Sequence, residues 1–300
     1  MKLAPEEIGR QMDALGLWKL LEHYNFGVKP KGTVFPYFCT VIFGDGQPVK
    51  VRFLMLEGWQ TLHDYIRLKM DANFGYYSSP FEMPHFELVV LTTGECRIFR
   101  HDVGYMPAPV SAAQQALVGC MLWEAYGIMM RLEANPRLLV SYAQDKALFA
   151  RIETERGVWN DAPLMVSNPP PYTEQVRLPK DVIKKAQDLP FVREAVFEVD
   201  FRLLPNVMTK EPRPRLAYGL RIFDVTANRL SVDQRVSVNP ESGLRALWEF
   251  MPAQFLNELV KQGRVPGEVK VCSGRVFRFL RPLCIELPFK LSLHDHLEHL

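Results

Sequence analysis

The sequence predicts a protein of two domains that combine the α+β and α/β classes. Its 300 residues are more than one average domain needs. Short β-branched runs alternate with segments of helical periodicity along most of the chain, whereas residues 157–175 lack periodicity and contain the proline-rich run 168–171. We therefore expect an N-terminal domain over 1–156, a proline-rich linker over 157–175 and a C-terminal domain over 176–300.

The first domain is expected to be built from two hairpins and a helix. Asp45-Gly46 separates two β-rich runs, and Gly94 separates another two, which indicates a hairpin in each place. The predicted elements are a helix over 5–24, strands over 34–43 and 49–56, a helix over 59–72, and strands over 86–92 and 96–99. The order strand, strand, helix, strand, strand predicts a β-grasp-like arrangement.

A long central helix is predicted from Ser111 to about Ala134. The Ser111 hydroxyl can cap its first turn, and Gln114, three residues later, completes the pattern of a capping box. Apolar residues occur nearly all around this helix, which predicts burial on most sides. Two further short strands are expected over 137–142 and 147–152.

The second domain is predicted to follow the order βββαβαβ, after a short helix that begins near Pro179. The expected elements are strands over 195–204, 216–225 and 230–238, a helix over 241–262, a strand over 269–272, a helix over 276–287 that Pro282 kinks or splits, and a strand over 289–293. The last two strands should be parallel neighbours, because a helix connects them. This order of elements is that of ribonuclease H-like folds.

The composition is that of an ordinary globular protein, with 48% hydrophobic and 23% charged residues and a formal charge of +2. Residues 1–10 lack the apolar stretch of a signal peptide, and no run approaches the roughly 18 apolar residues of a membrane span. The five cysteines form no CxxC pair and are expected to be reduced packing residues. These features predict a cytoplasmic protein without a membrane partner, and no motif indicates a cofactor.

Three carboxylates of the second domain are the candidates for a nuclease site. Ribonuclease H-like nucleases hold Mg²⁺ with carboxylates from the first strand, the first helix and the fourth strand, and Mg²⁺ prefers oxygen ligands. Asp200 lies in the first predicted strand, and Glu249 and Glu258 lie in the following helix. The fourth strand ends without a carboxylate, which favours a scaffold of this shape without a metal site.

Histidines at the end of the chain are the candidates for a metal site. His294, His296 and His299 stand within the last seven residues, together with two carboxylates, and such side chains can bind Zn²⁺ or Ni²⁺. A chain end is commonly mobile, however, and a site without supporting residues binds weakly.

Basic residues of the second domain are the candidates for nucleic-acid binding. Arg275, Arg278 and Arg281 recur at every third position of the last predicted helix, and Arg213 and Arg215 lie in a proline-rich loop. A basic stripe of this kind can follow a phosphate backbone. A solvated helix face has the same pattern.

Aromatic residues and histidines of the first domain are the candidates for ligand binding. Tyr76 and Tyr77 belong to an aromatic stretch that lies between His63 and His85, and these four side chains can line a groove. A packed aromatic lid over the sheet is the competing interpretation. His101 is isolated in the sequence, which is more typical of a core histidine.

Short segments of both domains resemble known families. Residues 264–271, with 280–284 and 289–291, resemble the C-terminal domain of uncharacterised bacterial proteins. Residues 61–66 and 85–87 resemble a family of plasmid-encoded open reading frames. The resemblance implies a bacterial, cytosolic, two-domain protein and brings no catalytic residues.

Together these observations predict a binding or interaction protein without catalytic activity. Its apolar and aromatic content is high, and no set of polar residues has catalytic spacing. The partner is either another protein or a nucleic acid. The alternative is a divergent nucleic-acid-binding or nuclease-like protein with a ribonuclease H-like C-terminal domain.

Overall fold

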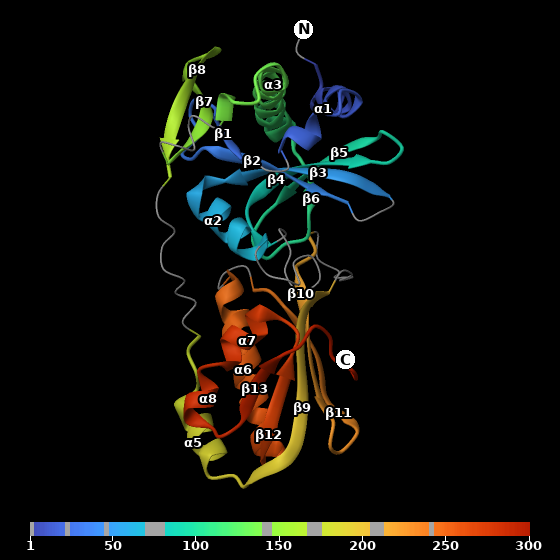
Figure 1. Ribbon diagram of the computed structural model, residues 1–300, viewed down its shortest axis with the longest axis vertical. Helices are drawn as coiled ribbons and strands as arrows, with labels where there is room; N and C mark the ends of the chain where they lie inside the picture. The colour runs from blue at the N-terminus through green and yellow to red at the C-terminus, as the bar shows by residue number, and fades with distance from the viewer. Residues whose placement is uncertain are drawn as a thin grey trace. The chain divides into compact units, whose positions relative to one another are not determined.

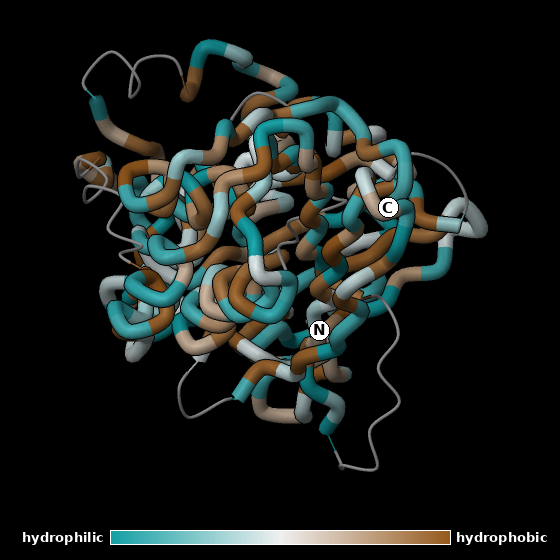
Figure 2. The backbone as a smooth tube through the Cα atoms, turned by 90° about the horizontal axis from the view of Figure 1, so that it is seen from below, coloured by the Kyte–Doolittle hydropathy of each residue, from teal (hydrophilic) through white to brown (hydrophobic). Residues whose placement is uncertain are grey.

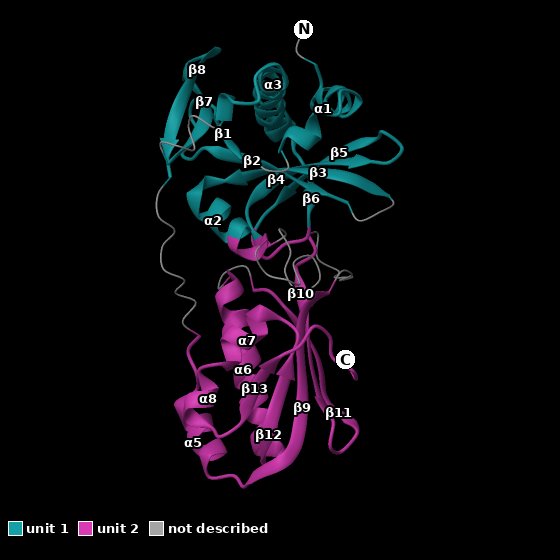
Figure 3. Ribbon diagram, in the orientation of Figure 1, with its two compact units in different colours: residues 1–66, 83–102, 107–170 teal, residues 67–82, 103–106, 171–300 magenta. Residues whose placement is uncertain are grey.

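The computed structural model describes residues 3–21, 25–44, 48–69, 82–139, 146–166, 176–204, 213–239 and 243–300. The chain forms two compact units, coloured separately in Figure 3. Unit 1 comprises residues 1–66, 83–102 and 107–170, and unit 2 comprises residues 67–82, 103–106 and 171–300. Each unit has a hydrophobic core of its own. The predicted proline-rich run 168–171 lies outside the described residues.

Unit 1 is built on an eight-stranded mixed sheet (Figure 1). In spatial order its strands are β6 (Ala108–Pro109), β5 (Cys96–His101), β4 (His85–Leu91), β3 (Val49–Glu57), β2 (Tyr37–Phe43), β1 (Phe26–Lys29), β7 (Ala147–Glu155) and β8 (Val158–Met165). Neighbouring strands are antiparallel except β1 and β7, which are parallel. The hairpins β2–β3 and β4–β5 confirm the sequence prediction.

Helices cover both faces of this sheet. The helices α1 (Pro5–Ala14) and α3 (Ala112–Ala134) pack on one face with the 3₁₀-helix Leu17–Leu21, and α2 (Gly58–Lys69) lies on the other, as Figure 1 shows. Strand residues alternate between these faces, since side chains of a strand point to opposite sides. Phe53 therefore packs in the α1–α3 core, whereas Phe38 contacts Trp59 of α2, with 4.5 Å between ring centroids.

The long helix α3 begins as predicted but is less buried than predicted. The Ser111 hydroxyl accepts a hydrogen bond from the Gln114 backbone N–H, and the Gln114 side-chain oxygen accepts one from the Ser111 N–H, so the capping box is confirmed. The prediction that the helix is buried on most sides is wrong, because Trp123 is 50% and Met130 37% exposed. One stripe of α3 faces the core, and an apolar flank remains at the surface.

Several other details of unit 1 differ from the prediction. A β-grasp module places its first strand beside its last, whereas β2 and β5 are separated here by β3 and β4 in an antiparallel meander. The strand β1 was not predicted. Residues 137–139 form a turn and the start of a helix instead of a strand, and β8 lies within the range predicted as linker.

Unit 2 is built on a five-stranded mixed sheet (Figure 1). In spatial order its strands are β11 (Arg229–Ser237), β10 (Ala217–Asp224), β9 (Phe191–Leu204), β12 (Val265–Val271) and β13 (Lys290–Leu293). The strand β10 is antiparallel to both of its neighbours, whereas β12 is parallel to β9 and to β13. The predicted parallel pairing of the last two strands is thus confirmed.

The helices of unit 2 pack on one face of its sheet. They are α5 (Lys180–Gln187), α6 (Gly243–Gln262), α7 (Gly274–Leu280) and α8 (Leu283–Glu286). They share a core with Phe197, Val199 and Phe201 of β9. Alternation along β9 therefore places Glu198 and Asp200 on the opposite face, away from these helices.

Local sequence explains the breaks in these elements. Pro282 separates α7 from α8, as predicted, whereas α6 continues through Pro252 as one helix. The pairing of β12 with β9 shifts register between Pro266 and Glu268. A Cβ atom at Gly267 would lie 1.9 Å from the backbone oxygen of Arg193, so only glycine permits this close approach of the two strands.

No helix of the described ranges is long and apolar enough to span a membrane. Hydrophobic and hydrophilic residues instead alternate in short stretches along the backbone in Figure 2. This pattern is the one expected when each element buries one side and exposes the other.

Candidate functional site

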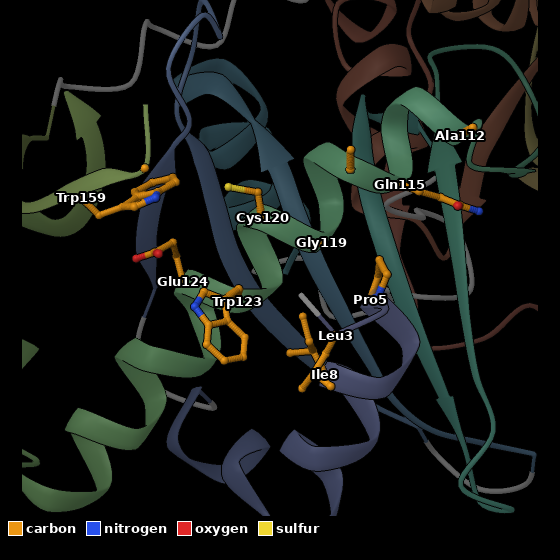
Figure 4. Close-up of a pocket in the computed structure, with 12 residues that line it drawn as sticks. Leu3, Pro5, Ile8, Ala112, Gln115, Gly119, Cys120, Trp123, Glu124 and Trp159 are labelled. Carbon is orange, nitrogen blue, oxygen red and sulfur yellow. The ribbon is translucent and has the colours of Figure 1, made fainter. Parts of the chain in front are cut away.

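A cavity of about 650 Å³ lies in unit 1 between α1, α3 and the β7–β8 hairpin (Figure 4). Figure 4 shows Trp123 and Glu124 of α3 between Trp159 on one side and Leu3 and Ile8 on the other. The remaining lining residues are Pro5, Ala112, Gln115, Ala116, Gly119, Cys120 and Gly157. The volume falls within the range of sites for small molecules, roughly 300–1,000 Å³.

The lining of this cavity is mostly apolar, and its carboxylate is already paired. Glu124 accepts a hydrogen bond from Arg151 Nε at 2.9 Å, and Arg151 also donates to Asp161 at 2.9 Å. Because a guanidinium neutralises Glu124, the cavity does not require a cationic ligand. Two indole rings, one on each side of Glu124, suit a neutral apolar molecule that contains rings.

A buried polar cluster lies elsewhere in unit 1, on the sheet face that α2 covers. His85 and Glu87 are two residues apart on β4 and therefore share a face, and His101 of β5 pairs directly with His85. The rings of His85 and His101 are stacked with their centroids 4.0 Å apart. One ligand atom from each of the three residues lies within 4.8 Å of the other two, and Arg52 of β3 donates a hydrogen bond to Glu87.

Burial and neighbouring charges set the protonation states of this cluster. Burial, with a smaller contribution from the neighbouring His101 ring, lowers the pKa of His85 to about 3, so the His85 ring is neutral at neutral pH. Burial alone raises the pKa of Glu87, but the hydrogen bond to His101 and the charge of Arg52 outweigh it, and the pKa falls to about 2. Glu87 is therefore an anion held by Arg52.

Unit 2 contains a second buried polar cluster, in its core. Arg275 donates two hydrogen bonds to the Glu82 carboxylate, at 2.8 and 2.7 Å, and the Tyr218 hydroxyl donates a third. The Arg275 guanidinium also lies 4.5 Å from the centroid of the Trp248 ring. Burial and the charge of Glu82 raise the pKa of Tyr218, so the phenol remains protonated. This cluster has the bidentate geometry of a structural ion pair.

The three carboxylates proposed for a nuclease site do not meet. Asp200 lies on the face of β9 that is opposite α6, which carries both Glu249 and Glu258. Glu249 accepts a hydrogen bond from Arg245 at 3.1 Å, and Glu258 accepts one from Gln262 at 2.7 Å. The structure thus gives these side chains separate partners.

Asp200 nevertheless has an unusual environment. Burial raises its pKa from 3.8 to about 6, and the charges of Arg202 and Arg221 oppose this shift only in part. Its Oδ2 lies 3.4 Å from Arg202 Nε, and its buried Oδ1 has no hydrogen-bond partner among the described residues. Asp200 therefore destabilises the folded unit whenever it is ionised.

The C-terminal histidines do not form a common site. His294 Nε2 lies 2.9 Å from the Ser292 hydroxyl, whereas the His299 ring stacks on Phe223 and its Nδ1 lies 3.2 Å from Glu198 Oε1. His296 is exposed. The backbone N–H groups of residues 298 and 299 also donate hydrogen bonds to Glu198. These bonds hold the last residues against strand β9, whereas the sequence predicted a mobile chain end.

The predicted basic stripe on the closing helix is interrupted. Arg275 is buried in the ion pair with Glu82, whereas Arg278 and Arg281 are exposed. The prediction that all three arginines form one basic stripe is therefore wrong. Arg213 lies over the ring of Tyr105 at 4.6 Å, and residue 215 pairs with residue 105 through a β-bridge. Neither loop arginine belongs to α7, which carries Arg278 and ends one residue before Arg281.

Only two of the four residues predicted to line a ligand groove are among the described residues. His63 is buried and stacks on Trp59, with 5.9 Å between the ring centroids, and His85 belongs to the cluster on β4. Tyr76 and Tyr77 lie outside the described residues. The sequence prediction missed Arg52 and His101 as members of the cluster. Pairing the predicted strands 86–92 and 96–99 around Gly94 would have placed His101 opposite His85.

The comparisons with known proteins concern unit 2. No curated protein and no solved structure has detectable similarity to this chain. Residues 182–300, which run from α5 through β13 to the chain end, match the profile of a family described as "Domain of unknown function (DUF6930)". The description names no activity, so the match carries none over. The C-terminal 119 residues, from 182 to 300, are thus similar to this family of domains of unknown function.

Proposed function

We propose that this protein binds a small, neutral, apolar molecule in the cavity between α1, α3 and the β7–β8 hairpin. The observation that carries the proposal is the 650 Å³ volume with two indole rings in its lining. Ligand sites typically combine a mostly apolar lining with a few polar groups that fix orientation. Here the polar groups are Gln115, Cys120 and the Arg151-paired Glu124.

The exposure of Trp123 supports the same proposal. It is 50% exposed although an indole is among the largest apolar surfaces a side chain offers. Its neighbours Leu3 and Ile8 point toward the same space (Figure 4). A ligand in this cavity would cover apolar surface that the fold leaves accessible, at about 25 cal/mol per Å².

Filling the cavity from the helix should abolish this binding. Gly119 lines the cavity, and a Cβ atom there would lie 3.3 Å from Pro5 Cγ, so the side chain of Gly119→Leu must occupy the ligand space or push α1 away. We expect saturable binding of the neutral fluorescent probe N-phenyl-1-naphthylamine by the wild type. We expect its affinity to fall at least about tenfold, or 1.4 kcal/mol, in Gly119→Leu.

Gly127→Leu is the matched control for this experiment. Gly127 lies on the same helix, two turns further on, and a Cβ atom there meets nothing within 4 Å. Both substitutions remove a helical glycine and gain similar helix propensity. The control should bind the probe like the wild type. Absence of probe binding by the wild type, or equal affinities of all three proteins, would refute the proposal.

A nucleic-acid-binding, ribonuclease H-like unit 2 is the second candidate. What favours it is the strand order β11-β10-β9-β12-β13 with β10 antiparallel to its neighbours, an arrangement that ribonuclease H-like folds share. This candidate predicts gel-shift binding of single-stranded RNA that weakens with salt and in the double variant Arg278→Ala/Arg281→Ala. No shift at low salt, or binding indifferent to these exposed arginines, would remove it.

A further inference from the structure

The cluster on β4 and β5 has the composition of a metal site. Two imidazoles and one carboxylate are a ligand set common for Zn²⁺ and for Fe²⁺. The ligand atoms of His85, Glu87 and His101 already lie within 4.8 Å of one another, and all three residues are buried. The His85 and His101 rings are stacked at an interplanar angle of 12°, so one ring must turn about its Cβ–Cγ bond for a nitrogen of each to bind the same ion.

His85 is held in the form that a metal ion requires. Its Nδ1 lies 2.8 Å from the carbonyl oxygen of Met83, and a carbonyl can only accept, so Nδ1 carries the proton. The lone pair is therefore on Nε2, which is buried and has no hydrogen-bond partner among the described residues. Metal-binding histidines commonly donate their second ring N–H to a backbone carbonyl in this way.

Glu87 and Arg52 complete the arrangement. Glu87 Oε2 lies 2.7 Å from His101 Nε2, whereas its Oε1 accepts the hydrogen bond of Arg52. One carboxylate oxygen is thus oriented by Arg52, while the other contacts His101. Supporting contacts of this kind fix the orientation of a ligating carboxylate.

We propose that His85, Glu87 and His101 bind one divalent transition-metal ion, with Zn²⁺ as the preferred occupant. The three ligands lie on β4 and β5 and are buried on the sheet face that α2 covers. The bound ion would therefore link the two strands and stabilise their hairpin. Three protein ligands leave a further coordination position for water. The competing arrangement is a metal-free network in which His101 donates to Glu87 and His85 Nε2 remains unpaired.

The test measures metal content and stability of the full chain, purified without a histidine tag. We expect about one Zn²⁺ per chain by plasma mass spectrometry, and a melting temperature that falls by several degrees on chelation and recovers with Zn²⁺. Co²⁺ added to the apoprotein should give the visible absorption bands of a nitrogen- and oxygen-ligated ion.

Variants distinguish this site from other histidines. Glu87→Gln, which keeps the side-chain volume, and His85→Ala should each lose the stoichiometric metal and the Co²⁺ bands. His63→Ala, on α2, and the triple variant of His294, His296 and His299 to Ala should retain both. Circular dichroism of each variant shows whether it is folded. A wild type that takes up no Zn²⁺, Fe²⁺ or Co²⁺, or metal retained in Glu87→Gln, would overturn the proposal.

Discussion

Arg275→Met should lower the free energy of unfolding of unit 2 by about 3–5 kcal/mol, because it leaves the Glu82 carboxylate buried without its cation. The side chains of Arg275 and Glu82 are only 6% and 4% exposed, so water cannot take the place of the guanidinium. Urea denaturation followed by circular dichroism measures the loss.

Two further variants isolate the cause of this loss. Glu82→Gln combined with Arg275→Met removes both charges and keeps an acceptor for Tyr218, so the double variant should be more stable than Arg275→Met alone. Arg281→Met changes an exposed arginine that follows α7 and should have an effect within about 0.5 kcal/mol. Equal stabilities of the Arg275 and Arg281 variants would contradict a buried ion pair.

Asp200→Asn should stabilise unit 2 at neutral pH by up to about 3 kcal/mol. The folded-state pKa of about 6 exceeds the ordinary value of 3.8 by about two units, and each unit corresponds to about 1.4 kcal/mol. A raised pKa means that the wild type is at full stability below about pH 4 and loses stability as the pH rises through about 6. The gain from Asp200→Asn should therefore be largest above about pH 7 and vanish toward about pH 4.

Urea denaturation across this pH range measures the difference between the two proteins. Asp233→Asn is the control, since Asp233 is an exposed carboxylate of β11 that pairs with Arg221, and it should change stability by less than about 0.5 kcal/mol. A pH-independent effect of Asp200→Asn, or destabilisation at neutral pH, would show that Asp200 is not penalised by burial.

Local signals in the sequence predicted much of the fold. The capping box of α3, the β4–β5 hairpin around Gly94, and the division of the closing helix at Pro282 each depend on residues close together in the chain. The parallel pairing of β12 and β13 followed from the helical connection between them. The first three features were confirmed because residues close together in the chain determine them, and the fourth because the connecting helix restricts the direction of the second strand.

Long-range pairing accounts for what the sequence did not predict. The four-residue strand β1 joins β2 to β7, and its pairing with β7 spans more than a hundred residues. Arg275 has the spacing of a solvated helix face, but its partner Glu82 lies 193 residues earlier in the chain. Periodicity cannot reveal that a cation has a distant anion.

The candidate sites depend on the same kind of information. His85 and His101 stand in ordinary strand sequences, and only the register between β4 and β5 brings their rings together. The cavity was missed because Trp159 lies within the range predicted as linker and Trp123 on a helix predicted to be buried. Both sites are formed by the packing of elements whose sequences carry no motif.

The most direct test of ligand binding in unit 1 is fluorine NMR of the protein labelled with 5-fluorotryptophan. The chain has five tryptophans, and substitution of each in turn assigns its resonance. Addition of N-phenyl-1-naphthylamine should shift the resonances of Trp123 and Trp159, which line the cavity, and leave those of Trp18, Trp59 and Trp248 in place. A spectrum that does not change, or shifts confined to the other three tryptophans, would contradict a binding site between α1, α3 and the β7–β8 hairpin.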